Sequence, residues 1–191
     1  EVHSDNYLLL DAKNLFIRSL SVSDFIKKEK LVTFEFSCPP ALRKWLEASC
    51  EYIGTEVPKN WVCMPTATPY MVKKSIANEI LDSPDFVKKF YGNTNLTEFF
   101  IYYAFLKNKN KIDEIYTYEK QFYATFFTTY PDTPDAIKIV KNSLENPITY
   151  CGSFHRNRII NNDFAVIEIM KNLIRDRKII ESMEEINTII S

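Results

Sequence analysis

Glycine is scarce in this chain, with three copies in 191 residues. Gly54, Gly92 and Gly152 lie far apart, and each stands where a preceding helix or strand is expected to stop. A phosphate-binding loop needs several glycines close together, because glycine adopts positive φ freely and lets a ligand approach the backbone. The sequence therefore contains no P-loop and no dinucleotide fingerprint. It also lacks the G-x-S-x-G elbow of α/β-hydrolases.

Long apolar runs and charge bias are absent as well. No run of 18 apolar residues occurs, so no membrane-spanning helix is predicted, and no signal peptide is visible. The 24 basic and 25 acidic residues give a net charge of −1 and are spread evenly over both halves. An apolar fraction of 46% is that of a globular protein with a core. We expect an intracellular protein, without a choice between cytoplasm and nucleus. Abundant Ile, Lys, Asn, Tyr and Phe suggest an AT-rich genome.

Cysteine is too sparse for a fold held together by disulfides. The four cysteines, at positions 38, 50, 63 and 151, are far below the density of small secreted domains. Free thiols are commonly buried and behave as small apolar side chains. The sequence therefore predicts four free, mostly buried thiols in a reducing compartment.

Residues 1–67 are predicted to mix strand and helix. Apolar and polar residues alternate over 31–36, which is typical of a half-buried strand. Residues 7–10 form a short apolar run that fits either a strand or a helix. A proline at position 40, followed by apolar residues at helical spacing, predicts a helix that ends near Gly54.

Residues 68–191 are predicted to form a helical bundle. Capping signals and prolines recur at short intervals. The expected helices cover 68–81, 84–92, 97–106, 112–130, 135–144 and 163–190. Short connections between helices favour a compact bundle. The predicted fold class is thus mainly α, a multi-helix bundle with a small N-terminal β element, in one continuous globular domain.

The C-terminal stretch suggests a protein interface. Its apolar residues follow near-heptad spacing, and those predicted at the interface are Ile169, Leu173, Ile180, Met183 and Ile190. Such a stripe either packs inside the chain or forms a groove for a partner or a second copy. The leading hypothesis is a non-catalytic interaction protein that binds a protein partner or self-associates through this region.

A basic and aromatic cluster offers a second hypothesis, a nucleic-acid-binding module at 150–178. Arginines grip phosphates and aromatic rings stack on bases, and the residues involved would be Tyr150, His155, Arg156, Arg158, Arg175, Arg177 and Lys178. Lys107, Lys109 and Lys111 would form a second contact. The alternative is a solvated loop whose arginines pair with Asp163 and Glu168.

A metal-dependent enzyme is the third hypothesis, and no catalytic residue is predicted. No cofactor is expected except zinc, for which Cys151, His155 and Cys63 supply suitable ligand types. Asp11-Ala12-Lys13 resembles the D-x-K triplet of PD-(D/E)xK nucleases, which implies carboxylates on a metal and a lysine that orients water. With two histidines in the chain, a classical nucleophile and base pair has little support.

Overall fold

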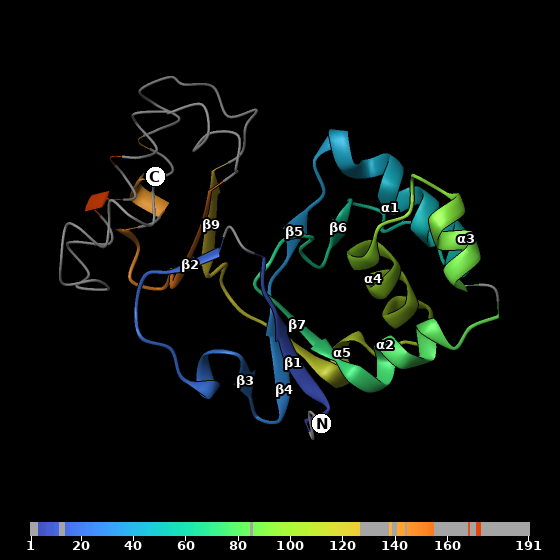
Figure 1. The fold of residues 1–191 in the computed structure, drawn as a ribbon, viewed down its shortest axis with the longest axis horizontal. Helices are drawn as coiled ribbons and strands as arrows, with labels where there is room; N and C mark the ends of the chain where they lie inside the picture. The colour runs from blue at the N-terminus through green and yellow to red at the C-terminus, as the bar shows by residue number, and fades with distance from the viewer. Residues whose placement is uncertain are drawn as a thin grey trace. The chain divides into compact units, whose positions relative to one another are not determined.

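A computed structural model of the chain describes residues 4–11, 14–84, 86–126, 138, 141–143, 145–154, 168, 171 and 172. The chain divides into two compact units (Figure 1). Unit 1 comprises residues 1–10 and 22–120, and unit 2 comprises residues 11–21 and 121–191. The chain therefore leaves unit 1 after Leu10 and returns to it at Val22.

The fold is mixed α/β, so the prediction of a mainly helical bundle is wrong. Among the described residues, the strands form two three-stranded and two two-stranded sheets. In unit 1, helices α1 to α4 gather on one side of the short strands (Figure 1). The sheets escaped prediction because their strands are short and pair across long stretches of sequence, which leaves little local periodicity to read.

The strands of unit 1 pair with partners distant in sequence. They are β1 (Asn6–Leu9), β3 (Ile26–Lys27), β4 (Lys30–Thr33), β5 (Phe36–Ser37), β6 (Val62–Cys63), β7 (Tyr70–Lys73) and β8 (Tyr116–Tyr118). β1 is antiparallel to β7, β5 is antiparallel to β6, and the third sheet has the order β3-β4-β8 with β4 parallel to β8. A short 3-10 helix, η1 (Val22–Asp24), precedes β3. β4 and β5 occupy the two ends of the stretch expected as one strand at 31–36, and β1 covers most of 7–10.

Five helices complete the described part of unit 1. They are α1 (Pro40–Ile53), α2 (Lys74–Leu81), α3 (Phe86–Gly92), α4 (Glu98–Asn108) and α5 (Ile112–Ile115). α1 begins with Pro40 in its first turn and ends at Gly54, whose left-handed φ of 79° reverses the chain. The N–H groups of Gly54 and Thr55 both donate to the carbonyl of Cys50, which satisfies the end of the helix.

Helix α4 is the centre of the core of unit 1. It packs most extensively against α1 and also against α2. Its buried residues point in every direction around the helix, and they are Phe100, Ile101, Tyr102, Tyr103, Ala104 and Leu106. A helix that is apolar all round must be enclosed on all sides. The surrounding helices and strands therefore fold around α4.

A chain of buried hydrogen bonds joins α4 to strands β7 and β8. The N–H of Lys73 donates to the hydroxyl of Tyr102 at 2.9 Å. The hydroxyls of Tyr102 and Tyr116 are 2.9 Å apart, and Tyr116 donates to the carbonyl of Met71 at 2.8 Å. Because the Tyr116 proton is used on Met71, Tyr102 must be the donor between the two hydroxyls. Every polar group in this series of hydrogen bonds thus has a partner.

Burial governs the ionisation of these tyrosines. It raises the pKa of Tyr116 far above its usual range, and the neighbouring hydroxyls of Tyr70 and Tyr102 raise it further. Burial also raises the pKa of Tyr102, against the smaller opposing effect of its hydrogen bonds. Both rings are therefore held neutral in the folded protein at any physiological pH.

Two predicted helices are only partly helical. In the segment 68–81, the peptide Thr68–Pro69 is cis, residues 70–73 are β7, and helix begins only at Lys74. In the segment 112–130, α5 is one turn long and is followed by β8 and by β9 (Tyr123–Phe126). Tyr, Thr and Phe favour strands, and here pairing with distant strands decided the outcome. The helices expected at 135–144 and 163–190 lie largely outside the described residues.

Unit 2 contains one three-stranded sheet in its described part. β10 (Cys151–Phe154) lies between β2 (Asn14–Phe16), to which it is antiparallel, and β9, to which it is parallel. The side chain of Asn14 donates to Ser153 Oγ at 2.6 Å across the sheet. Gly152 lies inside β10, so the expectation that it marks the end of an element is wrong.

Among the residues with described structure, no helix combines the length and the apolar character that crossing a bilayer requires.

Replacing Gly54 with alanine is expected to lower the free energy of unfolding by about 1 kcal/mol. Alanine in the left-handed region costs about 1–2 kcal/mol, and part of this is offset by a less flexible unfolded chain. Nothing lies within 4 Å of an added Cβ at either Gly54 or Gly92, and only Gly54 has positive φ. Gly92→Ala is therefore the matched control and should leave stability unchanged or slightly raised. Urea unfolding of both variants measures this, and equal losses would contradict the left-handed cap.

Tyr116→Phe is expected to destabilise the protein at pH 7 by about 1–3 kcal/mol, because Tyr102 loses its acceptor and the Met71 carbonyl loses its donor. Above pH 10 the wild type should lose stability faster than the variant. The unfolded chain releases the Tyr116 proton near the ordinary pKa, while the folded protein retains it, so the free energy of unfolding falls as pH rises. This effect reaches about 1.4 kcal/mol per pH unit.

The difference in the free energy of unfolding between the wild type and Tyr116→Phe should therefore become smaller between pH 9 and pH 11, as measured by urea unfolding. Tyr91→Phe removes a hydroxyl from a residue that is 83% exposed and should follow the wild type at every pH. If the free energies of unfolding of the wild type and Tyr116→Phe differ by the same amount at every pH, the buried neutral state of Tyr116 is contradicted.

Candidate functional site

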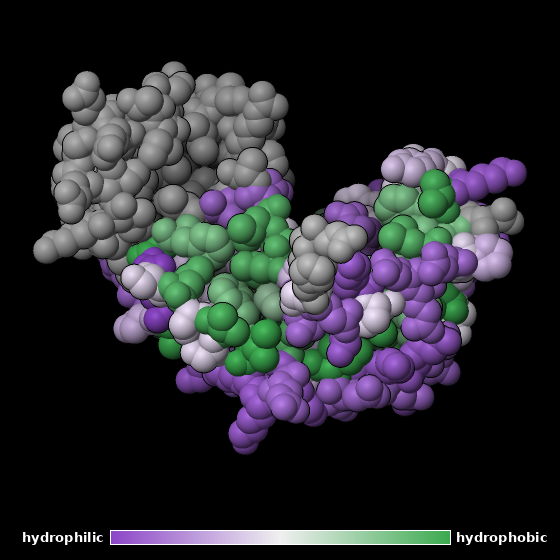
Figure 2. Space-filling view, turned by 60° about the horizontal axis from the view of Figure 1, so that its bottom comes forward, coloured by the Kyte–Doolittle hydropathy of each residue, from purple (hydrophilic) through white to green (hydrophobic). Residues whose placement is uncertain are grey.

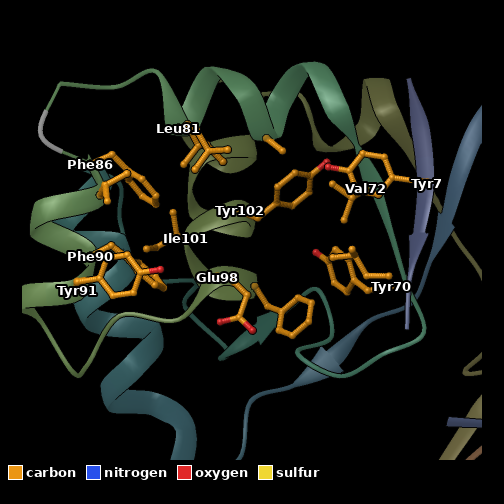
Figure 3. Close-up of a pocket in the computed structure, with 15 residues that line it drawn as sticks. Tyr7, Tyr70, Val72, Leu81, Phe86, Phe90, Tyr91, Glu98, Ile101 and Tyr102 are labelled. Atoms are coloured by element: carbon orange, nitrogen blue, oxygen red, sulfur yellow. The ribbon is translucent and has the colours of Figure 1, made fainter. Parts of the chain in front are cut away.

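One concave feature of unit 1 is a pocket of about 360 Å³. Its lining comes from β1, β7, α2, α3 and α4. Figure 3 shows the aromatic side chains of α3 on one side, Tyr7 and Tyr70 on the other, and residues of α4 between them. The volume lies within the range of small-molecule sites, about 300–1,000 Å³.

The α3 wall is built from three aromatic residues. Phe86 and Phe90 are one helical turn apart, and their rings stack with centroids 5.6 Å apart. The ring of Tyr91 meets Phe90 nearly edge-on, with centroids 5.8 Å apart. Because i and i+4 positions share one face of a helix, the sequence of α3 places its rings together on the pocket side.

The opposite wall and the floor form an aromatic corner. Tyr70 on β7 packs against Phe99, with centroids 5.0 Å apart, and against Tyr102, with centroids 6.0 Å apart and planes at 85°. Tyr7 on β1 lies beside this group, and Figure 3 shows its ring and that of Tyr102 pointing toward each other. The pairing of β1 with β7 brings Tyr7 here, since Tyr7 lies opposite Val72.

Polar groups in the pocket are few and differ in availability. The hydroxyl of Tyr102 is fully used by Lys73 and Tyr116. Within the described residues, the hydroxyl of Tyr7 forms no hydrogen bond, and the carboxylate of Glu98 has no ion-pair partner. Of the lining residues that the structure describes, Glu98 is the charged one, and it is exposed at the start of α4. The pocket can therefore offer a ligand one hydroxyl and one negative charge.

Apolar side chains extend from the pocket to the surface. Four of its lining residues are large, apolar and exposed, namely Leu9 at 36%, Leu81 at 54%, Val87 at 54% and Tyr91 at 83%. Figure 2 shows a group of apolar side chains toward the right-hand end of unit 1, on the side where α3 lies in Figure 1. A contiguous exposed apolar patch commonly marks a binding surface.

Sequence reasoning missed this pocket. The spacing of Phe86 and Phe90 and the unbroken apolar run after Glu98 were visible signals of helices with buried faces. Nothing in the sequence shows that Tyr7 and Tyr70 face these helices, because that contact depends on the β1–β7 pairing.

The structure places few of the residues predicted for nucleic-acid contact. Tyr150 is 3% exposed, stacks on Phe122 with centroids 4.8 Å apart, and lies under the guanidinium of Arg18 at 4.9 Å. Its ring therefore belongs to the packing of unit 2. The other residues of that group, and those of the predicted protein interface, lie outside the described residues. Both assignments stay predictions.

Two of the three lysines proposed as a second nucleic-acid contact, Lys107 and Lys109, form side-chain contacts within unit 1. Lys107 Nζ donates to the carbonyl of Glu56 at 2.7 Å and to Thr55 Oγ1 at 3.3 Å. Lys109 forms an ion pair with Glu79 at 3.5 Å. These contacts tie α4 to the end of α1 and to α2.

The four cysteines are free and buried, as predicted. In unit 1, burial raises the pKa of Cys38, of Cys50 and, most strongly, of Cys63, where the two neighbouring thiols add to the effect. Neutral thiols are poor metal ligands.

The described residues contain no group of three or more His, Cys, Asp or Glu side chains that could hold a metal ion. Cys63 lies in unit 1 and Cys151 in unit 2, while His155 is outside the described residues. The zinc site therefore stays a prediction. Of the D-x-K triplet only Asp11 is described, and its N–H donates to Asn14 Oδ1 at 2.7 Å in a tight turn.

Comparison with protein-family models gives a match. Residues 1–128 match the protein family DUF6492, described as a family of unknown function, and this segment includes all of unit 1. Neither the curated proteins nor the solved structures gave a match. Since the matched segment is well over half of the 191 residues, this protein belongs to the DUF6492 family.

Proposed function

We propose that this protein binds a small, largely apolar ligand in the pocket of unit 1. The observation that carries the proposal is the combination of a concave aromatic lining with an exposed apolar rim. Sites for small molecules are typically apolar hollows with a few convergent polar groups. Here those groups are the hydroxyl of Tyr7 and the carboxylate of Glu98.

The rim distinguishes a binding site from a simple packing defect. A defect in a core is enclosed, whereas this pocket opens among Leu81, Val87 and Tyr91, which are all more than half exposed. Leaving such side chains in water forgoes about 25 cal/mol for each Å² of apolar surface. A ligand that covers them recovers this free energy on binding.

The walls support a preformed site. α4 forms the floor and is anchored to β7 through the hydrogen bond of Lys73 with Tyr102, and Tyr70 is held between two other rings. A site whose walls are already ordered loses less conformational entropy when the ligand binds. The ligand therefore meets a surface that is fixed by the fold of unit 1.

A neutral aromatic probe, N-phenyl-1-naphthylamine, is expected to bind with a rise in fluorescence. At about 0.3 kcal/mol per non-hydrogen atom, about 17 atoms give about 5 kcal/mol, or a Kd on the order of 100 µM. Ala77→Phe, which places a ring into the pocket from α2, should weaken binding at least about tenfold. Val87→Trp, at the exposed rim, should weaken it without disturbing the core.

Asn78→Phe is the matched control for Ala77→Phe. It adds the same ring to the next position of α2, which is exposed and does not line the pocket. This variant should bind the probe as the wild type does. The proposal fails if the wild type does not bind the probe, or if the pocket variants and Asn78→Phe bind it equally well.

A further inference from the structure

We infer that the ligand of this pocket carries a positive charge, and that Glu98 selects an amine on an apolar body. The inference rests on the proposed function, since it names the chemical class of the ligand for the same pocket. Three observations support it, namely the isolated charge of Glu98, the orientation of the aromatic rings and the engagement of nearby lysines.

The first observation is the state of Glu98. Among the described residues of the lining, it is the sole charged one, and the others are apolar or aromatic. No ion pair involves it within the described part of the chain, so its charge is not neutralised by a neighbour. Figure 3 shows its carboxylate beside the hollow, between the α3 side and the Tyr70 side. A ligand anion would be repelled at this position, and a cation would be attracted.

The second observation is the arrangement of the rings. Tyr70 meets Phe99 at 45° and Tyr102 at 85°, so the rings do not form one flat stack and their faces point in different directions. The face of an aromatic ring carries partial negative charge and attracts ammonium groups within about 6 Å of its centre. A carboxylate next to several rings is the combination that recognises an amine joined to an apolar body.

The third observation concerns the lysines on neighbouring elements. Lys73, next to the pocket on β7, is paired with Asp5 at 3.7 Å, and Lys109 at the end of α4 is paired with Glu79 at 3.5 Å. The charges of these two lysines are therefore balanced by other carboxylates, and within the described residues Lys74 on α2 and Lys88 and Lys89 on α3 form no ion pair with Glu98. Glu98 remains available to a ligand.

Glu98 also has a purely structural explanation, because it is the acidic residue in the first turn of α4 and Thr97 makes no side-chain capping bond there. The two roles differ in what they predict. If Glu98 only stabilises the helix, replacing it lowers the free energy of unfolding and leaves the relative affinities of differently charged ligands unchanged. If Glu98 recognises the ligand, replacing it changes which of these ligands binds most tightly.

The test uses three probes with one ring system and different charges, namely 2-(1-naphthyl)ethylamine, 2-(1-naphthyl)ethanol and 1-naphthaleneacetic acid. At pH 7 they are cationic, neutral and anionic. Wild-type protein should bind the amine about fivefold to tenfold more tightly than the alcohol, and the acid most weakly, in calorimetric titrations at low salt. Higher salt should reduce the preference, since Glu98 is exposed.

Glu98→Gln should bring the affinity for the amine to that for the alcohol and leave the alcohol unchanged, and Glu98→Lys should favour the acid. Glu51→Gln removes the same charge from an exposed position of α1 and should keep the wild-type order. If the three probes bind equally and Ala77→Phe blocks them all, the charge preference is wrong and the pocket stands. If none of them binds to the wild type, both proposals are overturned.

Discussion

Enclosure of α4 is the constraint on which the rest of unit 1 depends. The helix is apolar on every face, and its central residues Phe100, Ile101 and Ala104 are at most 1% exposed. No single neighbour can cover such a helix, so α1, α2 and the strands around β7 must approach from different directions. The hydrogen-bonded tyrosines Tyr102 and Tyr116 then provide a polar connection through this core that fixes the position of α4 against the strands.

The pocket lies over the part of α4 that its neighbours leave incompletely covered. Phe99 and Glu98, at the start of the helix, are not fully buried, whereas residues from Phe100 to Ala104 are. The short α3, which supplies Phe86 and Phe90, covers this end without closing it. The same apolar sequence that makes α4 the core of unit 1 therefore also provides the floor of a binding site.

Local signals predicted local structure well. Pro40, the apolar spacing after it and Gly54 are enough to define α1, because helix initiation and termination depend on a few adjacent residues. The pocket could not be predicted in this way, since it requires Leu9 to lie opposite Tyr70, far along the chain. The segment at 112–126 shows the same limit. Its aromatic density suggested a buried helix face, but Tyr116 pairs with Leu31 and Tyr123 pairs with Cys151 in parallel strands.

The extent of the family match bears on how the two units are built. Residues 1–128 contain β2 and β9, which are the outer strands of the described sheet in unit 2. These two strands do not pair with each other, because β10 lies between them, and β10 begins at Cys151, beyond the matched segment. Unit 1 has all its described strands within the match, whereas the sheet of unit 2 is completed by a strand from outside it.

Without β10, both β2 and β9 would present unpaired edges, which β-sheet proteins avoid. Strand β10 is therefore a structural requirement of the described sheet of unit 2, while the described core of unit 1 and its pocket lie wholly within the matched segment.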